Sequence, residues 1–107
     1  MTHKATEVTI VAEKVIQEQI VEIIERAGAT GYTILEGSGK GQHARRTHER
    51  PSVAGDAFDI VKIEAILGDR AAAEQVADEV ANTLFTHYSG IVYLEEVEIL
   101  RRARFWR

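Results

Sequence analysis

The residues of this chain that are best suited to chemistry lie between positions 36 and 51. Glycines alternate at Gly37, Gly39 and Gly41, cations and histidines follow them, and the run ends at the only proline, Pro51. Alternate glycines can adopt positive φ angles, which turn successive backbone N–H groups toward a bound anion. Lysine adds a point charge, and arginine can hold two phosphate oxygens at once. The run therefore predicts an anion-binding site formed by Gly37, Ser38, Gly39, Lys40, Gly41, Gln42, Arg45 and Arg46.

Other chemistry can be weighed from the same region. His43, His48 and Glu49 are competent metal ligands, but their spacing matches no strong metal motif and the chain has no cysteine. We therefore expect no metal site. The order of the residues suggests no nucleophile–base set, and the glycine run holds no pair of acids for Mg²⁺, so the sequence predicts a binding protein and not an enzyme. A hairpin tip with solvated charges is the alternative, because alternate glycines alone are a weak motif.

Charge is unevenly distributed along the 107 residues, which we expect to form a single domain. The net charge is −4, yet the run from 40 to 50 carries +3, the tail from 101 to 107 carries +4, and the remainder carries −11. Positive features on an acidic body can concentrate small anions, whereas a nucleic-acid binder is more often basic overall. No apolar run approaches the roughly 18 residues of a membrane span. We expect a cytoplasmic protein that neither spans a membrane nor binds nucleic acid.

The elements that position the glycine run follow from hydrophobic periodicity. Strands are expected over 7–11, 32–35, 58–67 and 91–99, and amphipathic helices over 13–27 and 70–84. Gly28 should end the first helix, and Asp69 should cap the second. The run then lies in a long loop at about 36–58. The order βαββαβ predicts an α+β, ferredoxin-like fold, in which two helices cover one face of a four-stranded antiparallel sheet.

The other face of this sheet should be uncovered in a single subunit. The strand at 58–67 alternates with period two, so Ile60, Lys62, Glu64 and Ile66 share the face opposite the helices. We interpret Lys62 and Glu64 as a structural ion pair. Isoleucines beside charged residues are too apolar to leave in water, and association of subunits would cover them. We therefore expect a homo-oligomer.

Several motifs in this topology resemble the PII signalling superfamily. They are Gly28-Ala29-Thr30-Gly31-Tyr32-Thr33-Ile34, Gly37-Ser38-Gly39-Lys40-Gly41, Val61-Lys62-Ile63-Glu64 and Tyr88-Ser89-Gly90-Ile91-Val92-Tyr93. The chain most resembles the PII-like branch associated with carboxysomes and bicarbonate transport. The resemblance implies a homotrimer that binds an adenine nucleotide between subunits, with Gly90 and Arg101 joining the residues of the glycine run. It also implies a ligand-responsive loop that contacts a target, such as a bicarbonate transporter or another component of inorganic-carbon uptake.

Two departures from conventional PII proteins sharpen these expectations. The segment at 85–90 is short and lacks the lysine that would hold outer phosphates, which favours AMP or ADP over a triphosphate. Ile60 stands where the family uses a lysine for 2-oxoglutarate, so sensing of that ligand is not expected. Bicarbonate could accept hydrogen bonds from N–H groups, Gln42 and the arginines. The alternative function is a divalent-metal-binding trimer of the same fold, similar to the cation-tolerance proteins.

Overall fold

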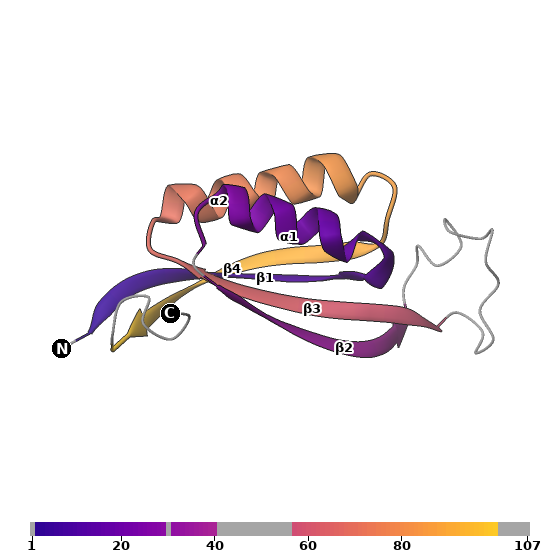
Figure 1. The fold of residues 1–107 in the computed structure, drawn as a ribbon, viewed down its shortest axis with the longest axis horizontal. Helices are drawn as coiled ribbons and strands as arrows, with labels where there is room; N and C mark the ends of the chain where they lie inside the picture. The colour runs from indigo at the N-terminus through magenta and orange to yellow at the C-terminus, as the bar shows by residue number, and fades with distance from the viewer. Residues whose placement is uncertain (1, 30, 41–56, 101–107) are drawn as a thin grey trace.

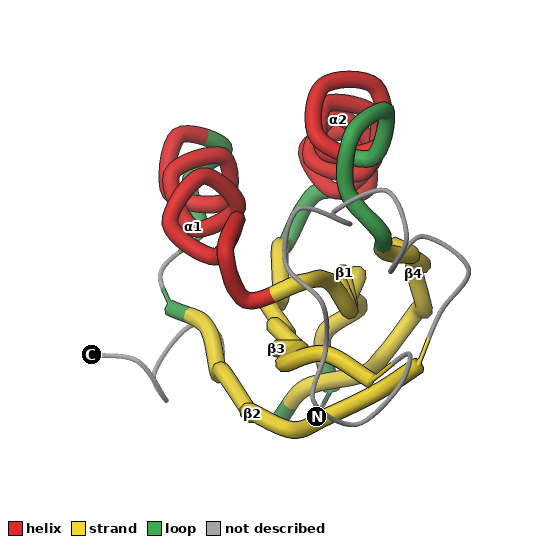
Figure 2. The backbone as a smooth tube through the Cα atoms, turned by 90° about the vertical axis from the view of Figure 1, so that its right-hand side faces the viewer, coloured by secondary structure: helices red, strands yellow, loops and turns green. Residues whose placement is uncertain are grey.

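The structure, a computed structural model, describes residues 2–29, 31–40 and 57–100. Its elements are β1 (His3–Glu13), a 3-10 turn (Lys14–Ile16), α1 (Gln17–Arg26), β2 (Tyr32–Lys40), β3 (Ala57–Leu67), α2 (Arg70–Glu79), a π-helical turn (Val80–Leu84) and β4 (Gly90–Ile99). The strands form one antiparallel sheet in the order β2-β3-β1-β4. Both helices lie on the same face of that sheet (Figure 1, Figure 2). The α+β, ferredoxin-like prediction is confirmed.

The hydrophobic core lies between this sheet and the two helices. Every second residue of β1 and β3 points into it, and the stripe of isoleucines on α1 closes it from above, as the two sequence periods predict. The fully buried side chains that fill it include Val8, Ile10, Ile16, Ile20, Ile24, Val61, Ile63, Val76 and Val80. Because both the strands and the helices contribute these residues, the core joins the sheet to the helix layer. No helix within the described ranges is long and apolar enough to cross a membrane.

Both helix boundaries that the sequence marked are found. Asp69 caps α2, because its Oδ1 accepts a hydrogen bond from the backbone N–H of Ala71 at 2.9 Å. Gly28 follows the end of α1 with a φ of 96°, a left-handed conformation that favours glycine. The first helix begins later than expected, however, because β1 continues to Glu13 and a 3-10 turn precedes Gln17.

The end of β2 differs most from the sequence expectation. The strand does not stop at 35 but continues to Lys40, so the first glycines of the run lie in a sheet. Gly37 pairs with Ile60 and Gly39 with Phe58, and among the described glycines only Gly28 has a positive φ. The prediction that Gly37 and Gly39 form an anion-binding concavity through positive φ angles is therefore wrong. The ladder with β3 extends their backbone, and most of the expected loop at 36–58 lies outside the described residues.

No element within residues 2–29, 31–40 and 57–100 covers the face of the sheet away from the helices, as predicted. It exposes large apolar side chains from two edge strands: Leu35 is 55% exposed, Ile91 58% and Tyr93 41%. The expected ion pair is present on this face, with Lys62 Nζ 3.6 Å from Glu64 Oε2. An exposed Tyr93 shows that this residue, unlike the partly buried Tyr32 and Tyr88, does not pack in the core of a single subunit.

Candidate functional site

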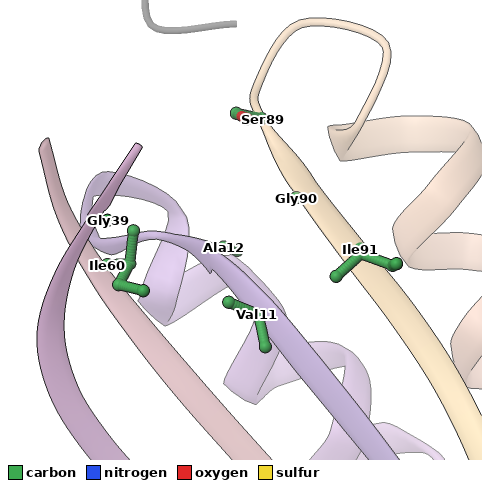
Figure 3. Close-up of a pocket in the computed structure, with 7 residues that line it drawn as sticks. All are labelled: Val11, Ala12, Gly39, Ile60, Ser89, Gly90 and Ile91. Atoms are coloured by element: carbon green, nitrogen blue, oxygen red, sulfur yellow. The ribbon is translucent and has the colours of Figure 1, made fainter. Parts of the chain in front are cut away.

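A cavity opens at the end of the sheet where β1 ends and β4 begins. Its volume is about 250 Å³, and the residues that line it are Val11, Ala12, Gly39, Ile60, Ser89, Gly90 and Ile91 (Figure 3). Apolar residues and glycines supply most of this lining, and Ser89 is the only described lining residue with a polar side chain. Such an apolar hollow with few polar groups suits the flat part of a small ligand, although ligand pockets are commonly somewhat larger, about 300–1,000 Å³. This cavity is therefore the candidate ligand site of a single subunit.

Gly90 lines the cavity on the β4 side, at a position where only glycine fits. A Cβ atom at this position would lie 2.3 Å from Phe85 Cε1 and 2.9 Å from the carbonyl oxygen of Val11. The ring of Phe85 thus lies directly against the backbone, and no side chain larger than hydrogen fits. Phe85 follows the π-helical turn at the end of α2, so that turn places the ring against Gly90, and the ring also packs on the hydrophobic core.

Gly39 stands on the opposite wall, at the end of β2. A Cβ atom there would lie 3.1 Å from Cδ1 of Ile60, which is a tight approach to the far end of a flexible side chain. The absence of a side chain lets Ile60 lie across the strand and line the cavity (Figure 3). Gly39 therefore makes room for Ile60 beside β3, whereas a Cβ at Gly37 would meet nothing within 4 Å.

Glu13, the last residue of β1, is bonded to Ser89, the residue before β4, a role that the sequence did not suggest. Its side chain is buried, with 6% of the residue exposed, and its Oε2 accepts a hydrogen bond from the backbone N–H of Ser89 at 2.6 Å. The backbone N–H of Glu13 donates in turn to the carbonyl oxygen of Ser89 at 3.4 Å. The only feature of the sequence that could have indicated burial of Glu13 is its position directly after the apolar residues of β1.

The structure brings together two of the residues that the sequence assigned to the site. Gly39 and Gly90 line the same cavity although they are distant in the chain. Gly37 and Ser38 are exposed on β2 outside that lining, and Lys40 ends the strand. The other assigned residues lie outside the described part of the chain: Gly41, Gln42, Arg45, Arg46 and Arg101. Their roles stay predictions.

The metal-binding alternative is not tested by the described residues. Its candidate ligands His43, His48 and Glu49 fall in the undescribed segment 41–56. Among residues 2–29, 31–40 and 57–100, no group of three or more histidines or acids is placed to hold a metal ion. That alternative therefore has no described residue to support it and stays a prediction.

A larger hollow, about 540 Å³, lies between the two helices. Arg26 and Glu79 line it and are joined by an ion pair of 3.1 Å. None of the residues assigned to the site from the sequence lies there. The smaller cavity is the better candidate because two residues that were assigned to the site, Gly39 and Gly90, meet in it.

The uncovered sheet face carries a group of acidic residues, whereas none of the described acids lines the cavity. Glu7 lies opposite Glu95 in the ladder between β1 and β4, and Glu64 lies on the neighbouring strand β3. Desolvation raises the pKa of Glu7 above its ordinary value of 4.5, Glu64 and Glu95 raise it further, and Lys62 opposes them. A folded subunit thus holds the proton of Glu7 more tightly than the unfolded chain does.

Comparisons with known proteins agree with this fold. The family model described as nitrogen regulatory protein P-II matches residues 5–104. The chain is similar to a structure described as a PII-like signalling protein from Thermus thermophilus, with 30% identity, a TM-score of 0.72 and coverage of 94% of this chain and 93% of that one. It is also similar to CPII from Thiomonas intermedia bound to ADP, AMP and bicarbonate, with 22% identity, a TM-score of 0.74 and coverage of 94% and 98%.

A more distant similarity is to a complex of GlnK with ATP from B. subtilis. Here the identity is 18%, the TM-score is 0.60, and 88% of this chain and 83% of that chain are covered. At identities of 22% and 18%, the similarities to CPII and GlnK concern the fold alone.

Proposed function

Because the chain belongs to the nitrogen regulatory protein P-II family, whose members are regulatory proteins and not enzymes, we propose that it is a sensor of adenine nucleotides. Its ligand is AMP or ADP, bound in the cavity between Gly39 and Gly90. The observation that carries the proposal is the meeting of these two residues at one cavity. Bicarbonate is proposed as a second ligand, and the CPII structure with ADP, AMP and bicarbonate supports this pair of ligands for the same fold.

The lining explains how the cavity would take such a ligand. Val11, Ile60 and Ile91 offer apolar surface on which an adenine ring can be desolvated. Phosphate needs cations, and no charged side chain is among the residues that line the described cavity. We propose that Arg46 and Arg101 supply this charge, since arginine binds phosphate oxygens in pairs. The segment 85–90 lacks a lysine for outer phosphates, which favours AMP and ADP over ATP.

PII proteins form trimers, and we propose that this chain does so through its uncovered sheet face. The exposed side chains of Leu35, Ile91 and Tyr93 lie on that face and would be removed from water. Ile91 also lines the cavity, so the association surface and the cavity are continuous. The neighbouring subunit would complete the site, with Arg101 reaching a phosphate across the boundary.

We propose that the bound ligands change the state of the segment 41–56, which contacts a target in inorganic-carbon acquisition. A ligand can do this only if its affinity differs between two states of the segment. The target would be a bicarbonate transporter or another uptake component. Lys40 ends β2 directly before the segment, so a change in the cavity reaches it through one strand.

The test is thermal unfolding of the protein with AMP, ADP and ATP. AMP and ADP should raise the melting temperature, because a ligand that binds only the folded state stabilises it. Arg46→Ala should remove most of that increase. Arg26→Ala is the matched control, because Arg26 lies in the groove between the helices and its loss should leave the ligand-induced increase unchanged. Absence of any shift with every adenylate would refute the proposal.

A further inference from the structure

We propose that Glu13 is the positioning residue of the cavity: its carboxylate fixes Ser89, so that the Ser89 hydroxyl and the Gly90 backbone meet the bound nucleotide. Ser89 and Gly90 both line the cavity, whereas Glu13 does not and so acts through Ser89. The inference rests on the proposed nucleotide binding and adds a specific contact to it.

The burial of Glu13 requires an explanation that core packing does not give. Glu13 is the only buried acid among the described residues. A buried carboxylate is costly unless hydrogen bonds satisfy it. The backbone N–H of Ser89 supplies such a bond to Glu13 Oε2, with a donor–acceptor distance of 2.6 Å. Glu13 is therefore held in place by one strong partner, and it holds that partner in return.

The contact between Glu13 and Ser89 lies at the end of the β1–β4 ladder, next to the cavity. The ladder between β1 and β4 ends at the pair Ala12 and Gly90, so Ser89 lies just beyond the last regular pairing. Glu13 continues the connection past that point through its side chain and its backbone N–H. On the other side, the ring of Phe85 lies against Gly90. The Ser89–Gly90 segment is thus fixed from two directions.

The same contacts determine what Ser89 can offer to a ligand. Glu13 occupies both its N–H and its carbonyl oxygen. The hydroxyl is the remaining polar group of a residue that lines the cavity opposite Gly39 (Figure 3). Hydroxyls both donate and accept, so this group can bind a ribose hydroxyl or a phosphate oxygen.

The test measures ADP affinity by isothermal titration calorimetry for Glu13→Ala, Glu13→Gln and Ser89→Ala. Glu13→Ala should bind ADP about tenfold more weakly, the change in affinity for losing one such hydrogen bond. Glu13→Gln should stay within about threefold of the parent protein, because its amide oxygen can still accept from Ser89. Glu22→Ala, which removes an exposed acid from α1, should bind like the parent protein.

Amide hydrogen exchange without ligand provides the second readout. In Glu13→Ala, the Ser89 amide should exchange faster than in the parent protein, whereas Glu13→Gln should retain slow exchange. Ser89→Ala keeps the backbone contact with Glu13, so its amide at position 89 should exchange slowly although the variant binds ADP more weakly. This variant also tests the proposal if Glu13→Ala does not fold. Unchanged ADP affinity in Glu13→Ala or in Ser89→Ala would overturn the positioning role while leaving nucleotide binding intact. Failure of the parent protein itself to bind any adenylate would instead overturn the proposed function, and this inference with it.

Discussion

Replacing Gly90 by alanine tests the packing at the cavity wall. The added methyl group would lie 2.3 and 2.4 Å from two ring carbons of Phe85 and 2.9 Å from the carbonyl oxygen of Val11. Neither neighbour can yield freely, because the Phe85 ring packs against the hydrophobic core and the Val11 carbonyl belongs to the backbone of β1. Overpacking of this kind costs about 1–3 kcal/mol, more than the roughly 0.4–1 kcal/mol that alanine gains over glycine through the unfolded chain.

We therefore expect Gly90→Ala to lower the free energy of unfolding by about 1–3 kcal/mol. In a domain of this size that corresponds to a fall in melting temperature of roughly 5–20 °C. Urea unfolding followed by circular dichroism measures the free energy. Gly37→Ala is the matched control, because a Cβ there meets nothing within 4 Å and its φ is not positive, so its stability should be unchanged or slightly higher.

A double-mutant cycle identifies the clashing partner. Phe85→Leu removes the ring, so Gly90→Ala should cost much less in that background, with a coupling on the order of 1 kcal/mol. Gly39→Ala should be milder than Gly90→Ala, since its nearest contact is the mobile end of Ile60 at 3.1 Å. If Gly90→Ala were as stable as Gly37→Ala, the close approach of Phe85 would be wrong.

Three further predictions concern Glu7 on the uncovered sheet face, the N-terminal cap of α2, and the association of subunits. Glu7→Gln should raise the free energy of unfolding at neutral pH by roughly 0.2–1 kcal/mol, the scale for facing like charges such as Glu7 and Glu95. The folded pKa of Glu7 is raised, so protonation of Glu7 favours the folded state, and this contribution to stability is lost as pH rises through that pKa. Below about pH 4, where the carboxyl is mostly protonated, urea unfolding should show no advantage of Gln over Glu at this position. Asp69→Ala should lower stability by about 1 kcal/mol in the same assay by removing the bond to Ala71, whereas Asp69→Asn should retain most of it. Tyr93→Asp should shift the assembly to smaller species in light scattering, and an unchanged molar mass would count against association through this face.

The sequence predicted the features that depend on local pattern. The period of two in β3 identified its buried side correctly, because alternation is a property of the strand itself. Asp69 and Gly28 marked helix boundaries, because capping and left-handed backbone are settled by single residues. The assignment of Gly90 to the same site as Gly39 came from the family resemblance and not from local pattern, and both residues line one cavity.

Features that depend on a distant partner were not predictable in this way. Glycines at 37 and 39 suggested a loop with positive φ angles, but pairing with Ile60 and Phe58 extended β2 through them. The burial of Glu13 depends on Ser89, which lies 76 residues away. A strand-ending glutamate ordinarily faces solvent, and only the fold shows which backbone group it can satisfy.

The most direct test of the central claim is a crystal structure of the protein grown with ADP. The account predicts ADP in the cavity between Gly39 and Gly90, with its base on the apolar lining and a second subunit completing the site. The Ser89 hydroxyl should lie within hydrogen-bond distance of the ligand. ADP bound instead in the groove between α1 and α2, or bound without contact to Gly39 and Gly90, would contradict it.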